Sequence, residues 1–97
     1  MNKILPNEKE ITGNWLTAEG RVVEDAACQR IADLTRICLL ELGRDSTGWD
    51  ALYRDPSDGR LWELIYPQSH LQGSGPPQLL CLSIDEARRK YGSIVSQ

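Results

Sequence analysis

A short turn between two strand-like runs is the feature that most constrains this chain. The turn is Asp55-Pro56-Ser57-Asp58-Gly59, and the flanking runs are residues 49–54 and 61–66. Proline presets φ for the first central position of a type I turn, and glycine tolerates the positive φ that follows. The sequence therefore predicts a β-hairpin over residues 49–66, in which Asp55, Pro56, Asp58 and Gly59 form the turn.

Both faces of this hairpin are partly apolar. Side chains alternate along a strand, so one face of the second run carries Trp62, Leu64 and Tyr66, and the other carries Leu61, Glu63 and Ile65. We expect one face to pack on a helix and the other to need cover from a further element or a partner. A homodimer is one way to supply that cover.

The clearest helix is expected over residues 25–42. Asp25 can cap its N-terminus, and Gly43 can adopt the left-handed conformation that ends a helix. An apolar stripe at spacings of three and four residues should face the core; it consists of Ala27, Ile31, Leu34, Cys38 and Leu42.

The remaining elements are shorter. Extended structure is expected over residues 11–24, with a turn at 18–20, and a strand over 79–82. Ser83 and Glu86 match a capping box, which predicts a helix ending at Tyr91 and Gly92. A chain of 97 residues is one domain. We therefore predict a single α+β domain over residues 1–97, with a central helix packed on an antiparallel sheet, a short C-terminal helix and a poorly anchored stretch at 1–10.

The negative charge is concentrated in one segment. The chain has 14 acidic and 11 basic residues, a net charge of −3. Residues 41–63 contain six acids and three bases, which leaves eight of each elsewhere. Such a stretch is either a solvated loop or a surface that attracts a basic partner. The lack of a basic excess argues against nucleic-acid binding, and no apolar run reaches the ~18 residues of a membrane span.

No catalytic signature is present. The chain has three cysteines, Cys28, Cys38 and Cys81, an odd number with no CxxC pair. This pattern predicts reduced, buried cysteines in the cytoplasm. His70 is the only histidine, so it cannot be part of a histidine metal cluster. We expect no catalytic residue, no cofactor and no metal.

The run GWDALYRDPSDGRLWELIYPQSHLQGSGPP, residues 48–77, resembles the Imm27 family of bacterial polymorphic-toxin immunity proteins. The likeness extends upstream through Gly20, the helix start at residues 25–28 and residues 30–31. Downstream it continues from Ser83 to Tyr91, so that it covers about residues 10–92. The resemblance implies a small α+β domain without catalytic activity. It also implies a gene beside that of a toxin used in competition between bacteria, and protection of the producing cell by binding the toxin domain.

The residues themselves agree with a binding protein. Nucleic-acid-cleaving toxins tend to be basic, so an acidic partner surface would compete with phosphate. The partner-binding candidates are Asp45, Trp49, Asp50, Arg60 and Glu63. Two alternative roles stay open, because Arg60 can pair with Asp55 or Asp58 across the turn and Trp49 can pack in the core.

Two other functions stay open. One is a general protein-interaction or accessory-subunit module that has no toxin partner. The other is a small hydrolase in which His70 acts with Ser69, Ser74 or Cys81.

Overall fold

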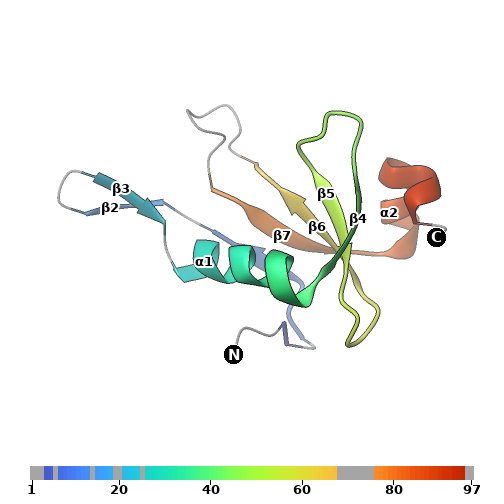
Figure 1. Cartoon of the computed structure of the whole chain (residues 1–97), viewed down its shortest axis with the longest axis horizontal. Helices are drawn as coiled ribbons and strands as arrows, with labels where there is room; N and C mark the ends of the chain where they lie inside the picture. The colour runs from blue at the N-terminus through green and yellow to red at the C-terminus, as the bar shows by residue number, and fades with distance from the viewer. Residues whose placement is uncertain are drawn as a thin grey trace.

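A five-stranded antiparallel sheet forms the centre of the molecule (Figure 1). The structure is a computed structural model that describes residues 4–5, 7–13, 15–18, 21–24, 26–67 and 76–95. The sheet has the order β1-β7-β6-β5-β4. Its strands are β1 (Glu10–Thr12), β4 (Leu40–Arg44), β5 (Ala51–Arg54), β6 (Leu61–Ile65) and β7 (Gln78–Leu82).

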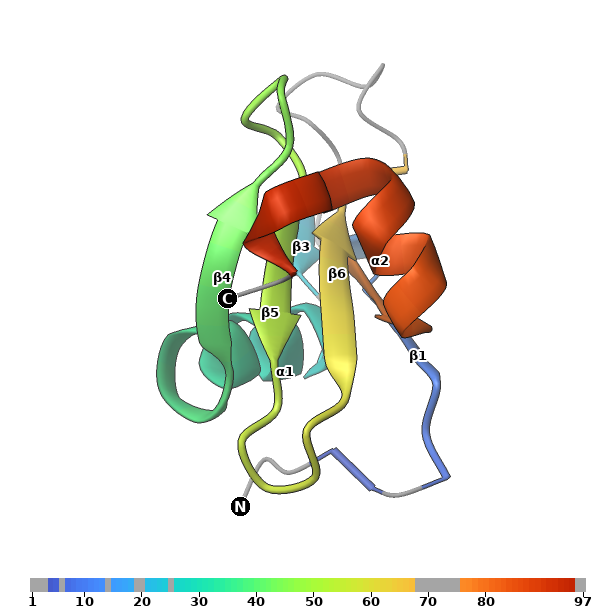
Figure 2. The ribbon, with the colours of Figure 1, turned by 90° about the vertical axis from the view of Figure 1, so that its right-hand side faces the viewer.

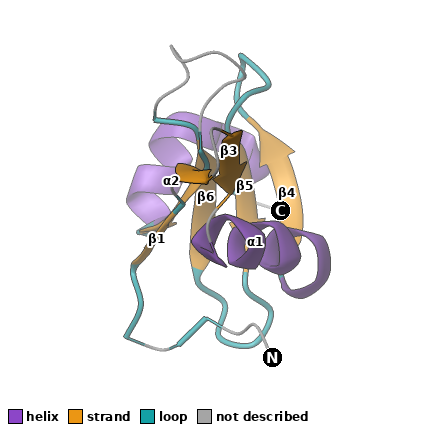
Figure 3. Cartoon of the chain, turned by 90° about the vertical axis from the view of Figure 1, so that its left-hand side faces the viewer, coloured by secondary structure: helices purple, strands orange, loops and turns teal. Residues whose placement is uncertain are grey.

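Helices cover both faces of this sheet. On one face lies α1 (Ala26–Asp33), which continues into the π-helical turn η1 (Leu34–Cys38). On the other lies α2 (Ile84–Tyr91), which is followed by the 3₁₀ turn η3 (Gly92–Ile94). Figures 2 and 3 view the sheet from its two sides, with α2 in front in one and α1 in front in the other. The predicted α+β class is confirmed.

A second, two-stranded sheet projects from the end of the molecule away from α2 (Figure 1). Its strands are β2 (Trp15–Ala18) and β3 (Arg21–Glu24), paired from Trp15–Glu24 to Ala18–Arg21. These strands confirm the extended structure expected over residues 11–24. Two expected features, the cap at Asp25 and part of the turn at residues 18–20, lie outside the described residues.

Strands β5 and β6 form the expected hairpin. Its turn is closed by the backbone N–H of Asp55, which donates to the carbonyl of Arg60 at 2.9 Å. The Asp55 carboxylate accepts from the N–H of Ser57 at 2.9 Å, and the Asp58 carboxylate accepts from the N–H of Arg60 at 3.0 Å. Gly59 has φ +79°, a conformation that costs a residue with a side chain more than glycine.

The two faces of the hairpin belong to separate cores. Trp62 pairs with Tyr53 across the strands and packs under α1, in a cluster that includes Ile31. On the other face, Leu52 pairs with Glu63 and packs against α2, in a cluster that includes Tyr91. Thus α2 provides the cover that the second face needs, and the apolar surface for which a homodimer was one possible cover lies inside the domain.

The central helix is shorter than the sequence predicted. It ends with η1 at Cys38, and Leu39 is already extended, with φ −102° and ψ 147°. Residues 40–44 form β4, which pairs with β5 from Leu40–Arg54 to Arg44–Ala51. The apolar periodicity cannot distinguish these outcomes, because pairing with a neighbouring strand overrides local helix preference.

Three residues assigned to the helix therefore have other surroundings. Gly43 does not end a helix: a Cβ there would lie 2.7 Å from Cδ1 of Ile94, so glycine lets η3 approach β4. Leu42 packs with the α2 cluster instead of the α1 cluster. Cys38 is exposed, while Cys28 is buried and Cys81 is half-buried, so the expectation of buried cysteines was wrong for Cys38.

The C-terminal helix begins and ends as predicted. The Ser83 hydroxyl accepts from the N–H of Glu86 at 3.1 Å, and the Glu86 carboxylate accepts from the N–H of Ser83 at 2.9 Å. Both halves of the capping box are formed, which satisfies two N–H groups that the helix itself leaves unpaired. Gly92, at φ +57°, follows Tyr91.

Two arginines hold the segment that precedes β1. Arg30 of α1 pairs with the Glu8 carboxylate at 2.5 Å. Arg60 donates to the carbonyls of Glu8 at 2.7 Å and Leu5 at 3.1 Å. The hydrogen bond from Arg30, followed by one from the backbone of Leu5, lowers the pKa of Glu8 to about 2.

Among the described residues, no helix has the length and apolar character needed to cross a membrane.

We expect Leu52→Ala to lower the free energy of unfolding by about 2–5 kcal/mol, because Leu52 is fully buried and its loss leaves a cavity. The matched control is Leu40→Ala on the adjacent strand, where 56% of the residue is exposed; its effect should stay within about 0.5 kcal/mol. Urea denaturation of both variants measures this. Equal losses would contradict the assignment of Leu52 to the second core.

Glu8→Gln should remove a pH-dependent contribution to stability. The pKa of Glu8 in the folded chain is about 2, below its ordinary value of 4.5. The contribution is therefore complete above about pH 4.5 and is lost as the pH falls towards 2. After a discount for partial exposure, we expect the variant to be about 1–2 kcal/mol less stable at pH 6 and equal to the parent near pH 2. Urea denaturation at several pH values measures this, and Arg30→Met in the Glu8→Gln background should add little. A deficit that does not change with pH would contradict the ion pair.

Candidate functional site

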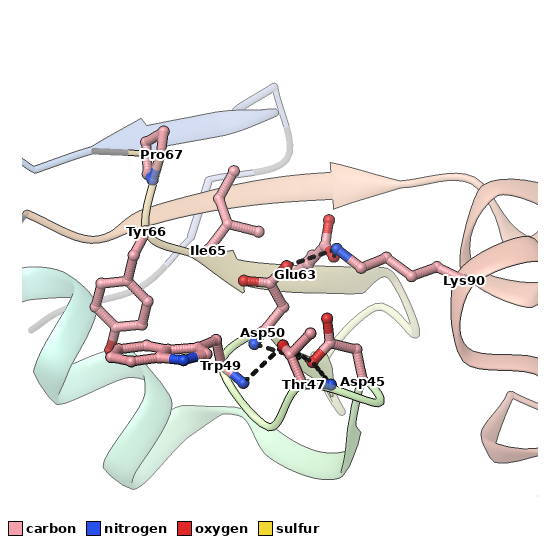
Figure 4. Close-up of a pocket in the computed structure, with 9 residues that line it drawn as sticks. All are labelled: Asp45, Thr47, Trp49, Asp50, Glu63, Ile65, Tyr66, Pro67 and Lys90. Atoms are coloured by element: carbon pink, nitrogen blue, oxygen red, sulfur yellow. Dashed lines mark hydrogen bonds and ion pairs between the residues drawn. The ribbon is translucent and has the colours of Figure 1, made fainter. Parts of the chain in front are cut away.

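A hollow of about 640 Å³ opens beside the loop that joins β4 to β5. Its walls come from that loop, from the end of β6 and from α2 (Figure 4). Nine residues line it: Asp45, Thr47, Trp49, Asp50, Glu63, Ile65, Tyr66, Pro67 and Lys90. We call it the acidic hollow, because its three carboxylates face a single ammonium group, a formal charge of −2.

The loop is built around Asp45. One oxygen of its carboxylate accepts from the Thr47 hydroxyl at 2.7 Å, the Thr47 N–H at 3.2 Å and the Gly48 N–H at 3.0 Å. The hydrogen bond from Thr47, with those from the backbone of Asp50 and Gly48, lowers the pKa of Asp45. Asp45 therefore stays ionised at neutral pH while it fixes the loop.

Lys90 bridges the loop and the sheet. Its ammonium lies 2.7 Å from Oδ2 of Asp50 and 2.6 Å from Oε2 of Glu63. Burial by itself would lower the pKa of Lys90, but the hydrogen bonds to Asp50 and Glu63 outweigh that effect and raise it. The bridge ties the end of α2 to both the loop and β6.

Glu63 is the only buried residue among the nine, with 6% of its surface exposed. Besides Lys90, its carboxylate accepts from the Tyr91 hydroxyl at 2.8 Å. Burial, and then the hydrogen bond to this carboxylate, raises the pKa of Tyr91 far above its usual range. An ionised side chain at this depth needs such partners, so Glu63 joins α2 to the second face of the sheet.

Trp49 stands at the edge of the acidic hollow and is 57% exposed. Its ring meets Tyr66 edge-to-face, with centroids 6.2 Å apart and planes at 75°. The same two residues also line a neighbouring hollow of about 460 Å³, together with Arg44, Thr47 and Gly48. The Trp49–Tyr66 pair thus forms a ridge shared by two hollows. Its exposure excludes the alternative in which Trp49 packs in the core.

The structure brings together four of the five partner-binding candidates, Asp45, Trp49, Asp50 and Glu63, but not Arg60. Arg60 directly precedes β6, at the β5–β6 turn. Figure 2 shows this turn at the other end of the strands from the β4–β5 loop. Its Nε is 2.6 Å from Asp58 and its guanidinium lies 5.1 Å from the centroid of the Trp62 ring. The pairing with Asp58 is one of the two alternatives that the sequence left open.

Sequence reasoning did not include Lys90, Tyr66 or Thr47 in the site. Tyr66 stands at the end of a predicted strand, and an estimate of strand register would have placed it near the loop. Thr47 follows Asp45 by two residues, a spacing at which aspartate forms local hydrogen bonds. Lys90 gives no such signal, because it reaches Asp50 across 40 residues of chain.

Of the residues named for a hydrolase, His70, Ser69 and Ser74 lie outside the described residues. Cys81 packs against the core under α1. Within the described ranges, no three histidine, cysteine, aspartate or glutamate side chains gather as metal ligands would.

Comparison with known families identifies the family of the chain. The model of the Imm27 family, described as Immunity protein 27, matches residues 17–83. This range contains every residue that lines the acidic hollow except Lys90. No match was found among curated proteins or among solved structures.

We expect Lys90→Met to lower the free energy of unfolding by about 1–3 kcal/mol. The substitution would leave the buried Glu63 carboxylate without its counter-ion. The expected loss of stability is smaller than for a fully buried pair, because the Lys90 side chain is 37% exposed. The control is Arg44→Met, which removes an exposed pair with Glu41 and should cost no more than about 0.5 kcal/mol. Urea denaturation at pH 7 compares them. A loss for Lys90→Met no larger than that of the control would show that the bridge is not a structural tie.

Proposed function

The chain belongs to the Imm27 family of immunity proteins, which supports a role in immunity to a toxin, and we propose that it neutralises a toxin domain by binding it at the acidic hollow. The chain would act as a non-catalytic inhibitor. The observation that carries the location is the exposed indole of Trp49 beside a hollow with a charge of −2.

An exposed tryptophan of this kind is typical of a binding surface. Large aromatic side chains contribute most where a partner can cover them. Trp49 is rigidly placed, because the loop is held by Asp45 and the ring rests against Tyr66. A preorganised aromatic side chain loses little conformational freedom on binding. The surface therefore offers an anchor that is already in position.

The charge of the hollow favours a basic partner. Asp45 and Asp50 lie in the segment that carries the net charge of the chain, and the single ammonium of Lys90 does not neutralise them. Acidic surfaces attract basic proteins and raise their association rate. A toxin that cleaves nucleic acid has a basic surface for phosphate, so we propose a nuclease as the toxin.

Exposure differs among the candidate residues, and this divides their roles. Trp49 is available to a partner, while Glu63 is buried and acts by holding Lys90 and Tyr91. We leave Arg60 out of the proposed surface, because it lies at the other end of the sheet.

The exposed thiol of Cys38 suits a reducing compartment, so we place the complex in the cytoplasm of the producing cell.

The test is co-expression with the toxin domain encoded beside the gene. We expect the full chain to restore growth and to be captured with the toxin domain in a pull-down. Trp49→Ala should weaken the complex at least tenfold, since the residue is a proposed anchor. Ile37→Ala is the matched control, because Ile37 is 72% exposed on η1 and lies outside the hollow. The affinity of this variant for the toxin domain should stay within threefold of that of the parent.

A chain that neither restores growth nor binds this toxin domain would overturn the proposal and favour the accessory-subunit alternative. A complex that forms equally well with Trp49→Ala would keep the function but move the surface.

A further inference from the structure

Asp50 has one carboxylate oxygen to spare. Oδ2 is bonded to Lys90 at 2.7 Å. Between the residues that the structure describes, the hydrogen bond of this carboxylate is made by Oδ2, and none is recorded for Oδ1. The side chain lines the acidic hollow and is 23% exposed. It therefore presents an acceptor that a second cation can use without displacing the first.

The aromatic wall of the hollow suits a cation as well. An indole ring is the aromatic surface that attracts cations most strongly. The chain already uses this contact elsewhere, because the guanidinium of Arg60 lies over the ring of Trp62 at 5.1 Å. Trp49 presents its ring to solvent, at the edge of a hollow that Asp50 also lines.

We propose that the acidic hollow receives an arginine side chain of the bound toxin domain. Its guanidinium lies against the indole of Trp49 and donates to Oδ1 of Asp50, while Lys90 remains bonded to Glu63. This inference rests on the proposed function and adds the chemistry of the group that is recognised.

Arginine fits these observations better than lysine. A guanidinium is planar and weakly hydrated, so it can stack on an indole and donate to a carboxylate at its edge. A lysine ammonium is compact and strongly hydrated, and it lacks the planar face that stacks on an indole. An anionic ligand is disfavoured, because the three acids outnumber the one ammonium.

The test is a double-mutant cycle with a catalytically inactive form of the toxin domain encoded beside the gene. Asp50→Asn keeps the shape of the side chain and removes its charge. We expect the dissociation constant to rise about tenfold, with a difference that shrinks at high salt. The control is Asp58→Asn, an acid in the β5–β6 turn, which Figure 2 shows at the other end of the strands from the β4–β5 loop. Its dissociation constant should stay within threefold of that of the parent. Thermal unfolding of each variant checks that the chain is folded.

The second half of the cycle identifies the toxin residue. Each arginine and lysine on the surface of the toxin domain is changed to alanine and measured against both the parent and Asp50→Asn. We expect one arginine whose loss weakens binding at least tenfold with the parent and less than threefold with Asp50→Asn. The same arginine should couple to Trp49→Ala.

The outcomes separate the two levels of the proposal. If no complex forms with the unmodified chain, the proposed function fails. The arginine inference is overturned, and the function stands, if the complex forms but Asp50→Asn binds within threefold of the parent. The same conclusion follows if Asp50→Asn couples only to a lysine of the toxin domain, or to none of its basic residues.

Discussion

The rest of the structure depends on the contacts of one buried group, the carboxylate of Glu63. It lies on the second face of the central hairpin, opposite Leu52. An ionised group in that place is unfavourable unless it is paired and hydrogen-bonded. Lys90 and Tyr91, neighbours at the end of α2, supply both partners at 2.6 and 2.8 Å. The carboxylate therefore specifies where α2 docks, while the surrounding apolar side chains provide the burial.

The same bridge connects the fold to the surface. Because Lys90 also bonds Asp50, the position of α2 is linked to the loop between β4 and β5. Asp45 closes that loop from within, so its shape is determined at two points. The Trp49 ring is then held by Tyr66 from the end of β6. The exposed Trp49 side chain therefore rests on supports from two parts of the fold, the loop and the end of β6.

Local sequence signals predicted the elements that depend on local contacts. The β5–β6 turn and the capping box of α2 follow from hydrogen bonds between residues two to three apart, and both could be predicted residue by residue. The failure at residues 39–42 has the opposite origin. Leu39 and Leu42 fit a helical stripe, but strand pairing with β5 decides their conformation. Gly43 shows the same limit: a contact with Ile94, distant in sequence, explains a glycine that seemed to be a helix cap.

The candidate site follows this division. The concentration of acids in residues 41–63 was visible in the sequence, and four of the five named residues meet in one hollow. What the sequence did not supply was the division of roles, since that depends on depth. Glu63 and Asp45 are committed to internal hydrogen bonds, whereas Trp49 and one oxygen of Asp50 are not. A substitution at residue 49 would therefore change the proposed binding surface while the two supports of the loop, at Asp45 and Asp50, stay in place. A small immunity domain built this way can vary its recognition chemistry without altering the core that positions it.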